Sequence, residues 1–180
     1  IRTFPKRVAS GRCWLLLLAL LAVTTAAGGA TADARALVAQ GQKAFQNGAF
    51  SQAAADWQKA VEAFRRQGNA NEEIATSISL ASAYQSIGQQ RRAVQLLEVA
   101  LLLAEKTGDP SRVTRVRSKL GAALLLILET ERAALLLGEA LAAARADNDA
   151  KLAAAILNDL GNLLATQQKN AEALTAYEES

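Results

Sequence analysis

The residue types that most often carry catalysis are scarce in this chain of 180 residues. It has no histidine, and Cys13 is its only cysteine. Glu72 with Glu73 and Glu129 with Glu131 are close carboxylate pairs. Adjacent residues on a helix point in different directions, and the second pair flanks an expected turn, so neither pair is arranged for acid–base work. We therefore expect no catalytic residue, no cofactor and no metal in this segment.

The net charge of +3 does not describe the chain as a whole. Arg2, Lys6, Arg7 and Arg12 all precede the first acidic residue, Asp33. From Asp33 onward the chain carries 16 Lys and Arg against 17 Asp and Glu, so this region is nearly neutral. It lacks the broad positive patch that nucleic-acid backbones require. The composition therefore predicts no nucleic-acid partner.

The first 32 residues have the pattern of a secretory signal peptide. Basic residues precede an apolar run, Trp14–Val23, and small residues follow it. Ala30-Thr31-Ala32 fits the cleavage pattern, so we predict cleavage after Ala32 and export to the periplasm or the extracellular space. The alternative is an anchor formed by residues 13–32, which carry no charge. Cleavage is favoured, because the strongly apolar run is shorter than the ~20 residues of a membrane span, and the cleaved chain is expected to have no membrane contact.

The rest of the chain predicts helices, because its apolar residues recur at helical spacing and Ala and Leu dominate its composition. Gly68-Asn69, Gly108-Asp109 and Asn148-Asp149 are typical of helix ends, since Gly and Asn tolerate the left-handed backbone found there. Ser51 is expected to cap a helix that follows the turn Asn47-Gly48. The expected helices are 34–46, 51–67, 71–87, 91–107, 111–128, 131–147, 150–167 and 170 onward.

Three register positions repeat every 40 residues. The first position holds a small residue in the first helix of each pair: Gly41, Ala81, Gly121 and Gly161. The second position holds a small residue in the second helix: Ala53, Ala93, Ala133 and Ala173. The third position holds a large residue in the second helix: Trp57, Leu97, Leu137 and Tyr177. A fixed period of this length is the signature of a helical solenoid. We predict an all-α, right-handed solenoid of antiparallel helix pairs, with units at about 34–73, 74–113, 114–153 and 154–180.

These positions resemble the consensus of the tetratricopeptide repeat family. The resemblance covers about residues 34–180 and includes Tyr84 and the turn glycines Gly48 and Gly88. The period of 40 exceeds the usual ~34 residues, as in the extended variants of the family. The third unit departs further, with Leu128 in place of the turn glycine and Thr130 in place of an aromatic residue.

The resemblance implies a protein–protein interaction module that binds a peptide or partner helix in a concave groove lined by the first helices. A chaperone C-terminus is disfavoured, because Val38, Ile78 and Ala122 occupy groove positions that would need polar groups. Asn158 and Asn162 lie one turn apart, where both amides could bond a peptide backbone. The groove candidates are Arg35, Gln42, Phe45, Gln46, Ser82, Gln85, Arg115, Ser118, Leu125, Asn158 and Asn162.

Two alternatives for the function stay open. The fourth unit stops at Ser180 within its second helix, so we expect a fragment of a longer protein. By analogy with exported bacterial proteins, the chain would then be the regulatory or substrate-presenting arm of a secreted enzyme such as a caspase-like (CHAT) protease. The second alternative is a self-assembling scaffold, since the apolar stretch around Leu126 and Leu136 exceeds what one helical seam needs. A thicker seam between longer helices is the favoured explanation of that stretch.

Arg112, Arg115 and Lys119 share one helical face, with Arg117 beside it. This face could meet an acidic partner. Solvated residues balanced by nearby acids are the favoured interpretation.

Overall fold

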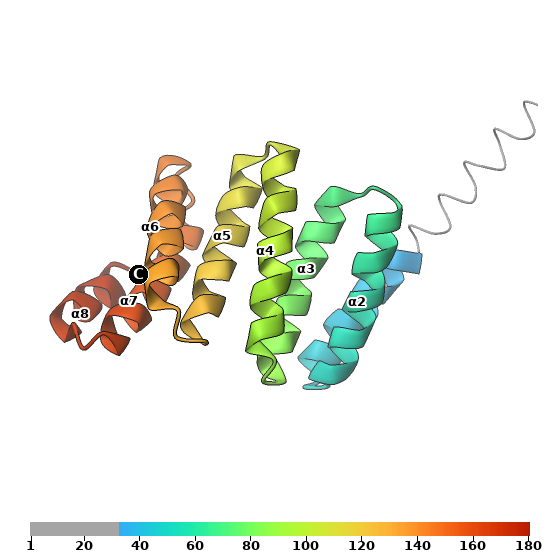
Figure 1. Ribbon diagram of the computed structural model, residues 1–180, viewed down its shortest axis with the longest axis horizontal. Coiled ribbons are helices and arrows are strands. Elements are labelled where there is room, and N and C mark those ends of the chain that lie inside the picture. Colours follow the sequence, from blue (N-terminus) through green and yellow to red (C-terminus); the bar gives the residue numbers. More distant parts are fainter. Residues whose placement is uncertain (1–32) are drawn as a thin grey trace, which may run out of the picture.

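The computed structural model describes residues 33–180, and these residues form helices and turns without any strand (Figure 1). The predicted signal peptide, its cleavage after Ala32 and the alternative anchor lie outside the described residues. No helix between residues 33 and 180 combines the length and the hydrophobicity that crossing a bilayer requires. A helix over residues 33–46 is followed by α2 (Phe50–Arg66), α3 (Ala70–Ser86), α4 (Gln90–Thr107), α5 (Pro110–Leu125), α6 (Thr130–Ala146), α7 (Ala150–Thr166) and α8 (Asn170–Glu179).

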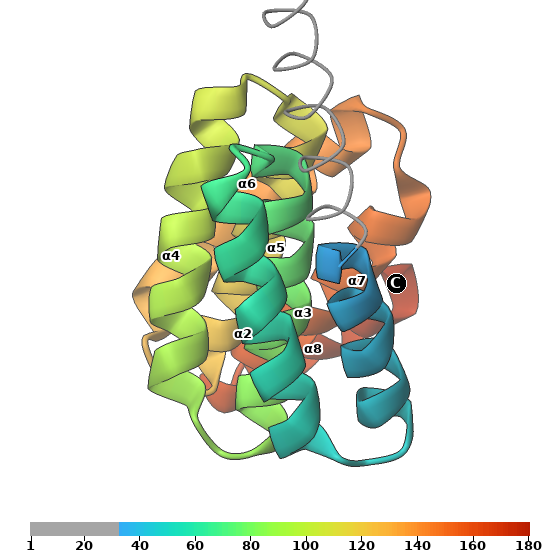
Figure 2. The same cartoon turned by 90° about the vertical axis from the view of Figure 1, so that its right-hand side faces the viewer.

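The predicted all-α solenoid of antiparallel helix pairs is confirmed. Helix 33–46, α3, α5 and α7 form one layer, and α2, α4, α6 and α8 form the other, so that each pair stacks on the next (Figures 1 and 2). Contacts join α3 to α5 and α5 to α7, whereas α2, α4 and α6 make no comparable contacts with each other. The first helices therefore form the tighter, inner layer, and the second helices spread apart on the outside.

The residues that end one pair also start the next. The side chains of Asn69, Asp109 and Asp149 accept hydrogen bonds from backbone N–H groups three residues further on, at 3.3, 3.1 and 3.0 Å. These caps satisfy donors that the first turn of α3, α5 and α7 leaves free. The expectation that Ser51 caps α2 is wrong: α2 starts at Phe50, and Ala49 before it supplies no side-chain cap.

A large side chain of each second helix presses on the backbone of the first helix of its pair. A Cβ atom added at Gly41 would lie 2.6 Å from Nε1 of Trp57, and one added at Gly121 would lie 2.7 Å from Cγ of Leu137. Trp57 also donates a hydrogen bond from Nε1 to the carbonyl of Val38 at 3.1 Å. These positions hold glycine because no carbon fits between the two helices.

The same contact recurs in the other two pairs. A Cβ at Gly161 would collide with the ring of Tyr177. In the second pair Ala81 takes the small position, and both Ala81 and Leu97 are buried in the largest core cluster. The 40-residue register thus repeats one physical contact.

The turn inside the third pair is strained. Gly48 and Gly88 adopt positive φ in the first two pairs, as expected. Leu128 takes the equivalent place with φ 63°, and α5 ends at Leu125 where the sequence predicted a helix to Leu128. A left-handed conformation costs a non-glycine residue roughly 1–2 kcal/mol, and Leu128 recovers little by burial because it is 73% exposed.

The contact between a large side chain of the second helix and a glycine of the first helix predicts opposite effects on stability for alanine substitutions at two helical glycines. Gly121→Ala forces a carbon against Leu137, which costs roughly 1–3 kcal/mol, while the helix preference of alanine returns up to about 1 kcal/mol. Gly138 lies in α6 with open space around its Cβ position, so Gly138→Ala should stabilise by about 0.5–1 kcal/mol. Urea unfolding of both variants tests this expectation, and shifts of the midpoint in the same direction would contradict it.

The strained turn predicts that Leu128→Gly stabilises the protein. The change removes the left-handed strain and loses little buried surface, so the net gain should be roughly 0.5–1 kcal/mol after the entropy cost of glycine. The reverse exchange at the matching turn, Gly88→Ala, should destabilise, because φ is 77° there although no atom lies within 4 Å. Thermal unfolding followed by circular dichroism measures both, and a lower midpoint for Leu128→Gly would show that the turn stores no strain.

Candidate functional site

The inner face is the surface that the first helices turn away from the second helices. On α5, Arg117 reaches outward to Glu105 of α4 and Glu139 of α6. Arg115 and Lys119 are exposed and lie about half a turn around the helix from Arg117. They therefore point away from α4 and α6, to the inner face.

Six of the predicted groove residues are exposed on the first helices: Arg35, Gln42, Gln46, Arg115, Asn158 and Asn162. Arg35 forms an ion pair with Glu72 of α3 at 3.5 Å. Asn162 is held in place, because its side-chain oxygen accepts a hydrogen bond of 2.8 Å from the hydroxyl of Tyr177. Arg115 has no ion pair among the described residues.

Ser118 must be removed from the predicted set. It is only 2% exposed, so it cannot contact a ligand. Ser118 occupies the same register position as the exposed Asn158, but α7 packs against α5, and no first helix packs beyond α7 among residues 33–180. The difference in exposure therefore comes from the neighbouring helix, not from the residue itself.

Four further candidates are half-buried and serve mainly the packing. The Phe45 ring meets the rings of Phe50 and Trp57 at centroid distances of 5.0 and 5.5 Å. Leu125 packs against two core clusters. The Ser82 hydroxyl donates to the carbonyl of Ile78 at 3.2 Å, and the side chain of Gln85 is half-buried on the same helix.

The inner face also contains a carboxylate that the sequence analysis missed. Burial raises the pKa of Asp159 on α7, and the charge of Lys119 on α5 partly opposes that rise. The two residues are 40 positions apart, so the repeat register could have placed them side by side. Arg112, the third member of the predicted basic face, pairs with Asp109 at 3.0 Å. This leaves Arg115 as the cation of that face without an acidic neighbour in the structure described.

A different kind of site lies on the outer face. An apolar groove of about 430 Å³ separates α4 from α6, with Leu101 and Leu102 on one side and Leu135 and Leu136 on the other. Leu120 of α5 forms its floor. Leu102 and Leu135 are 60% and 62% exposed, which is unusual for leucines that lie close together. The predicted excess of apolar residues in the third unit is therefore partly exposed.

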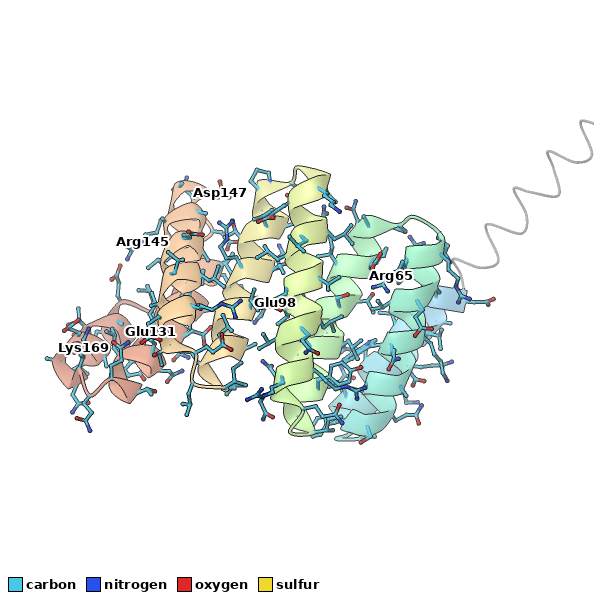
Figure 3. The ribbon with its side chains drawn as sticks, viewed as in Figure 1. Arg65, Glu98, Glu131, Arg145, Asp147 and Lys169 are labelled. Carbon is cyan, nitrogen blue, oxygen red and sulfur yellow. The ribbon has the colours of Figure 1, made fainter. Side chains whose placement is uncertain are left out.

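Ion pairs lie at both ends of this groove: Arg132 joins α6 to α4 at one end, and Arg117 of α5 reaches α4 and α6 at the other. At one end Arg132 contacts Glu98 at 2.7 Å and Glu129 at 2.6 Å, and these hydrogen bonds raise the pKa of its guanidinium. Glu98 lies near the middle of α4 in Figure 3. At the other end Arg117 approaches Glu105 at 3.8 Å and Glu139 at 3.4 Å.

No group of three or more His, Cys, Asp or Glu residues is placed to hold a metal ion within residues 33–180.

Comparisons with known proteins give the same kind of fold. Residues 76–111, which cover most of α3 and all of α4, match the profile described as the tetratricopeptide repeat. No curated protein matches the sequence. The apo form of RapI is similar, with a TM-score of 0.75 at 15% identity over 82% of this chain and 54% of RapI. The chain thus spans about half the length of RapI.

Two further solved structures share the fold. A Rap protein complexed with Competence and Sporulation Factor has a TM-score of 0.72 at 13% identity, over 82% of this chain and 42% of that protein. A putative kinesin light chain from Podosopora anserina with nearly identical TPR-like repeats has a TM-score of 0.56 at 18% identity, over 81% of this chain and 92% of its own. At these identities the likeness concerns the fold.

The neighbours of Asp159 predict a measurable pH effect. Burial favours the neutral carboxyl and Lys119 favours the charged one, so Lys119→Gln should raise the pKa of Asp159 further. A carboxyl whose pKa is raised in the fold contributes stability at low pH that is lost as the pH rises through that pKa. NMR titration of Asp159 and urea unfolding across the acidic range measure both effects. Lys151→Gln, also on α7, is the control, and an equal shift in both variants would contradict the pairing.

Proposed function

We propose that this chain is a non-catalytic protein–protein interaction module that binds an extended peptide or partner helix on its inner face. The observation that carries this proposal is the set of exposed polar groups on neighbouring first helices, namely Arg115 on α5 and Asn158 and Asn162 on α7. Amides can bond both the N–H and the C=O groups of a peptide backbone, and a guanidinium can hold a carboxylate through two hydrogen bonds.

Three of the four carboxylates considered for acid–base chemistry have structural partners. Glu72 pairs with Arg35, Glu73 pairs with Arg65 at 2.8 Å, and Glu129 pairs with Arg132. This arrangement supports a binding role for the described part of the chain.

The fold supports the same role. A Rap protein of similar fold was solved complexed with Competence and Sporulation Factor, and stacked helix pairs create extended surfaces suited to binding. We extend the proposal to an exported protein, because the first 32 residues have the pattern of a signal peptide. Mass spectrometry of the N-terminus after expression in a secreting host tests this part, and a retained leader would reject cleavage after Ala32.

The proposed inner-face function is tested by peptide selection. Random peptides displayed on phage are selected on the full chain, and the enriched sequences are synthesised and their Kd measured. Arg115→Ala should weaken binding roughly tenfold, which corresponds to the loss of one charge-assisted hydrogen bond. Asn158→Ala should weaken it less, because a neutral hydrogen bond is worth less.

Lys106→Ala is the matched control, since Lys106 is an exposed cation at the end of α4 on the outer layer. It should leave the Kd unchanged. Selected peptides that bind Arg115→Ala as tightly as the parent chain would reject the inner face as the binding site.

A further inference from the structure

We propose that the outer groove between α4 and α6 docks an amphipathic partner helix with leucine-like residues at its centre and basic residues about two turns apart. This site lies on the opposite layer from the proposed inner-face site and does not depend on it. The shape of the groove, its charge and the composition of the chain itself support this occupant.

The groove has the dimensions of a helix-binding surface. Glu98 and Glu105 are seven residues apart on α4, which spans about 10.5 Å along a helix, and Arg132 and Glu139 have the same spacing on α6. Between these residues lie Leu101 and Leu102 on α4 and Leu135 and Leu136 on α6. A helix lying along the groove would bring apolar residues of two successive turns onto the leucines.

The charges at the two ends favour a basic occupant. The charged residues that line the groove are Glu98, Glu105 and Arg132, so its lining carries one surplus negative charge. The four glutamate side chains of the ion pairs at its ends remain 41–47% exposed, so their carboxylates can accept further hydrogen bonds. Lys or Arg residues placed on either side of the apolar centre would meet Glu98 at one end and Glu105 at the other.

A second copy of the chain fits the groove poorly. Two copies meeting through this face would oppose the same surplus of negative charge, which disfavours association. Moreover, a helix of this chain that has two basic residues seven positions apart around apolar pairs, α2 with Lys59 and Arg66, buries Val61 and Phe64 in its own core. The occupant is therefore a helix from a different protein.

The experiment uses two synthetic helical peptides of about four turns. Each has a central Leu-Leu pair on an alanine and glutamine background; one carries a lysine on either side, seven residues apart, and the other has glutamates there. Fluorescence anisotropy with the full chain should give at least roughly tenfold tighter binding of the lysine peptide, and added salt should reduce this difference. Glu98→Gln with Glu105→Gln should reduce it as well.

The variant Leu135→Glu should abolish binding of the lysine peptide without unfolding the protein, because that side chain is already exposed. Leu174→Glu is the matched control, as Leu174 is 58% exposed on α8, outside the groove. Arg115→Ala should not change this binding, which separates the result from the inner-face proposal. Circular dichroism melting confirms that the variants fold.

Three outcomes would overturn the proposal. Equal binding of the two peptides would remove the charge argument, and lysine-peptide binding that survives Leu135→Glu would place the site elsewhere. A concentration-dependent dimer in sedimentation that Leu135→Glu dissociates would show that the occupant is a second copy of the chain.

Discussion

The close approach of the two helices within each pair determines the rest of the structure. In three pairs it requires a glycine in the first helix, because the side chain of Trp57, Leu137 or Tyr177 lies directly on the backbone there. This contact sets how each second helix lies on its partner, and therefore how wide the gap between successive second helices becomes. The inner face and the outer groove are both consequences of this contact.

The two faces differ in chemistry because they differ in packing. The inner layer brings first helices into contact, so that Ser118 is buried between them while Arg115 stays exposed. The outer layer leaves α4 and α6 apart, and the leucines between them stay exposed with ion bridges at either end. A polar face suits an extended peptide, whereas an apolar groove with charged ends suits a helix.

Much of this fold could be predicted from the sequence, because the repeated glycines and helix ends report local chemistry. Helix bounds agreed to within a residue or two, apart from the end of α5, where the predicted helix ran to Leu128 although Leu128 adopts the left-handed turn conformation. The candidate sites were harder to predict. The burial of Ser118 and the outward reach of Arg117 depend on how neighbouring pairs stack, and a single 40-residue register position does not show that. Likewise, the cap expected from Ser51 failed because α2 starts one residue earlier, at Phe50.

The central claim is that the contact between a large side chain of the second helix and the glycine of the first helix determines how the two helices pack. A double-mutant cycle on Gly121 and Leu137, measured as free energies of unfolding in urea, tests it most directly. Leu137→Ala removes the side chain that a carbon at position 121 would strike. The account predicts that Gly121→Ala destabilises the parent chain but becomes neutral or stabilising in the Leu137→Ala background, a coupling of about 1 kcal/mol or more. The same cost in both backgrounds would contradict it.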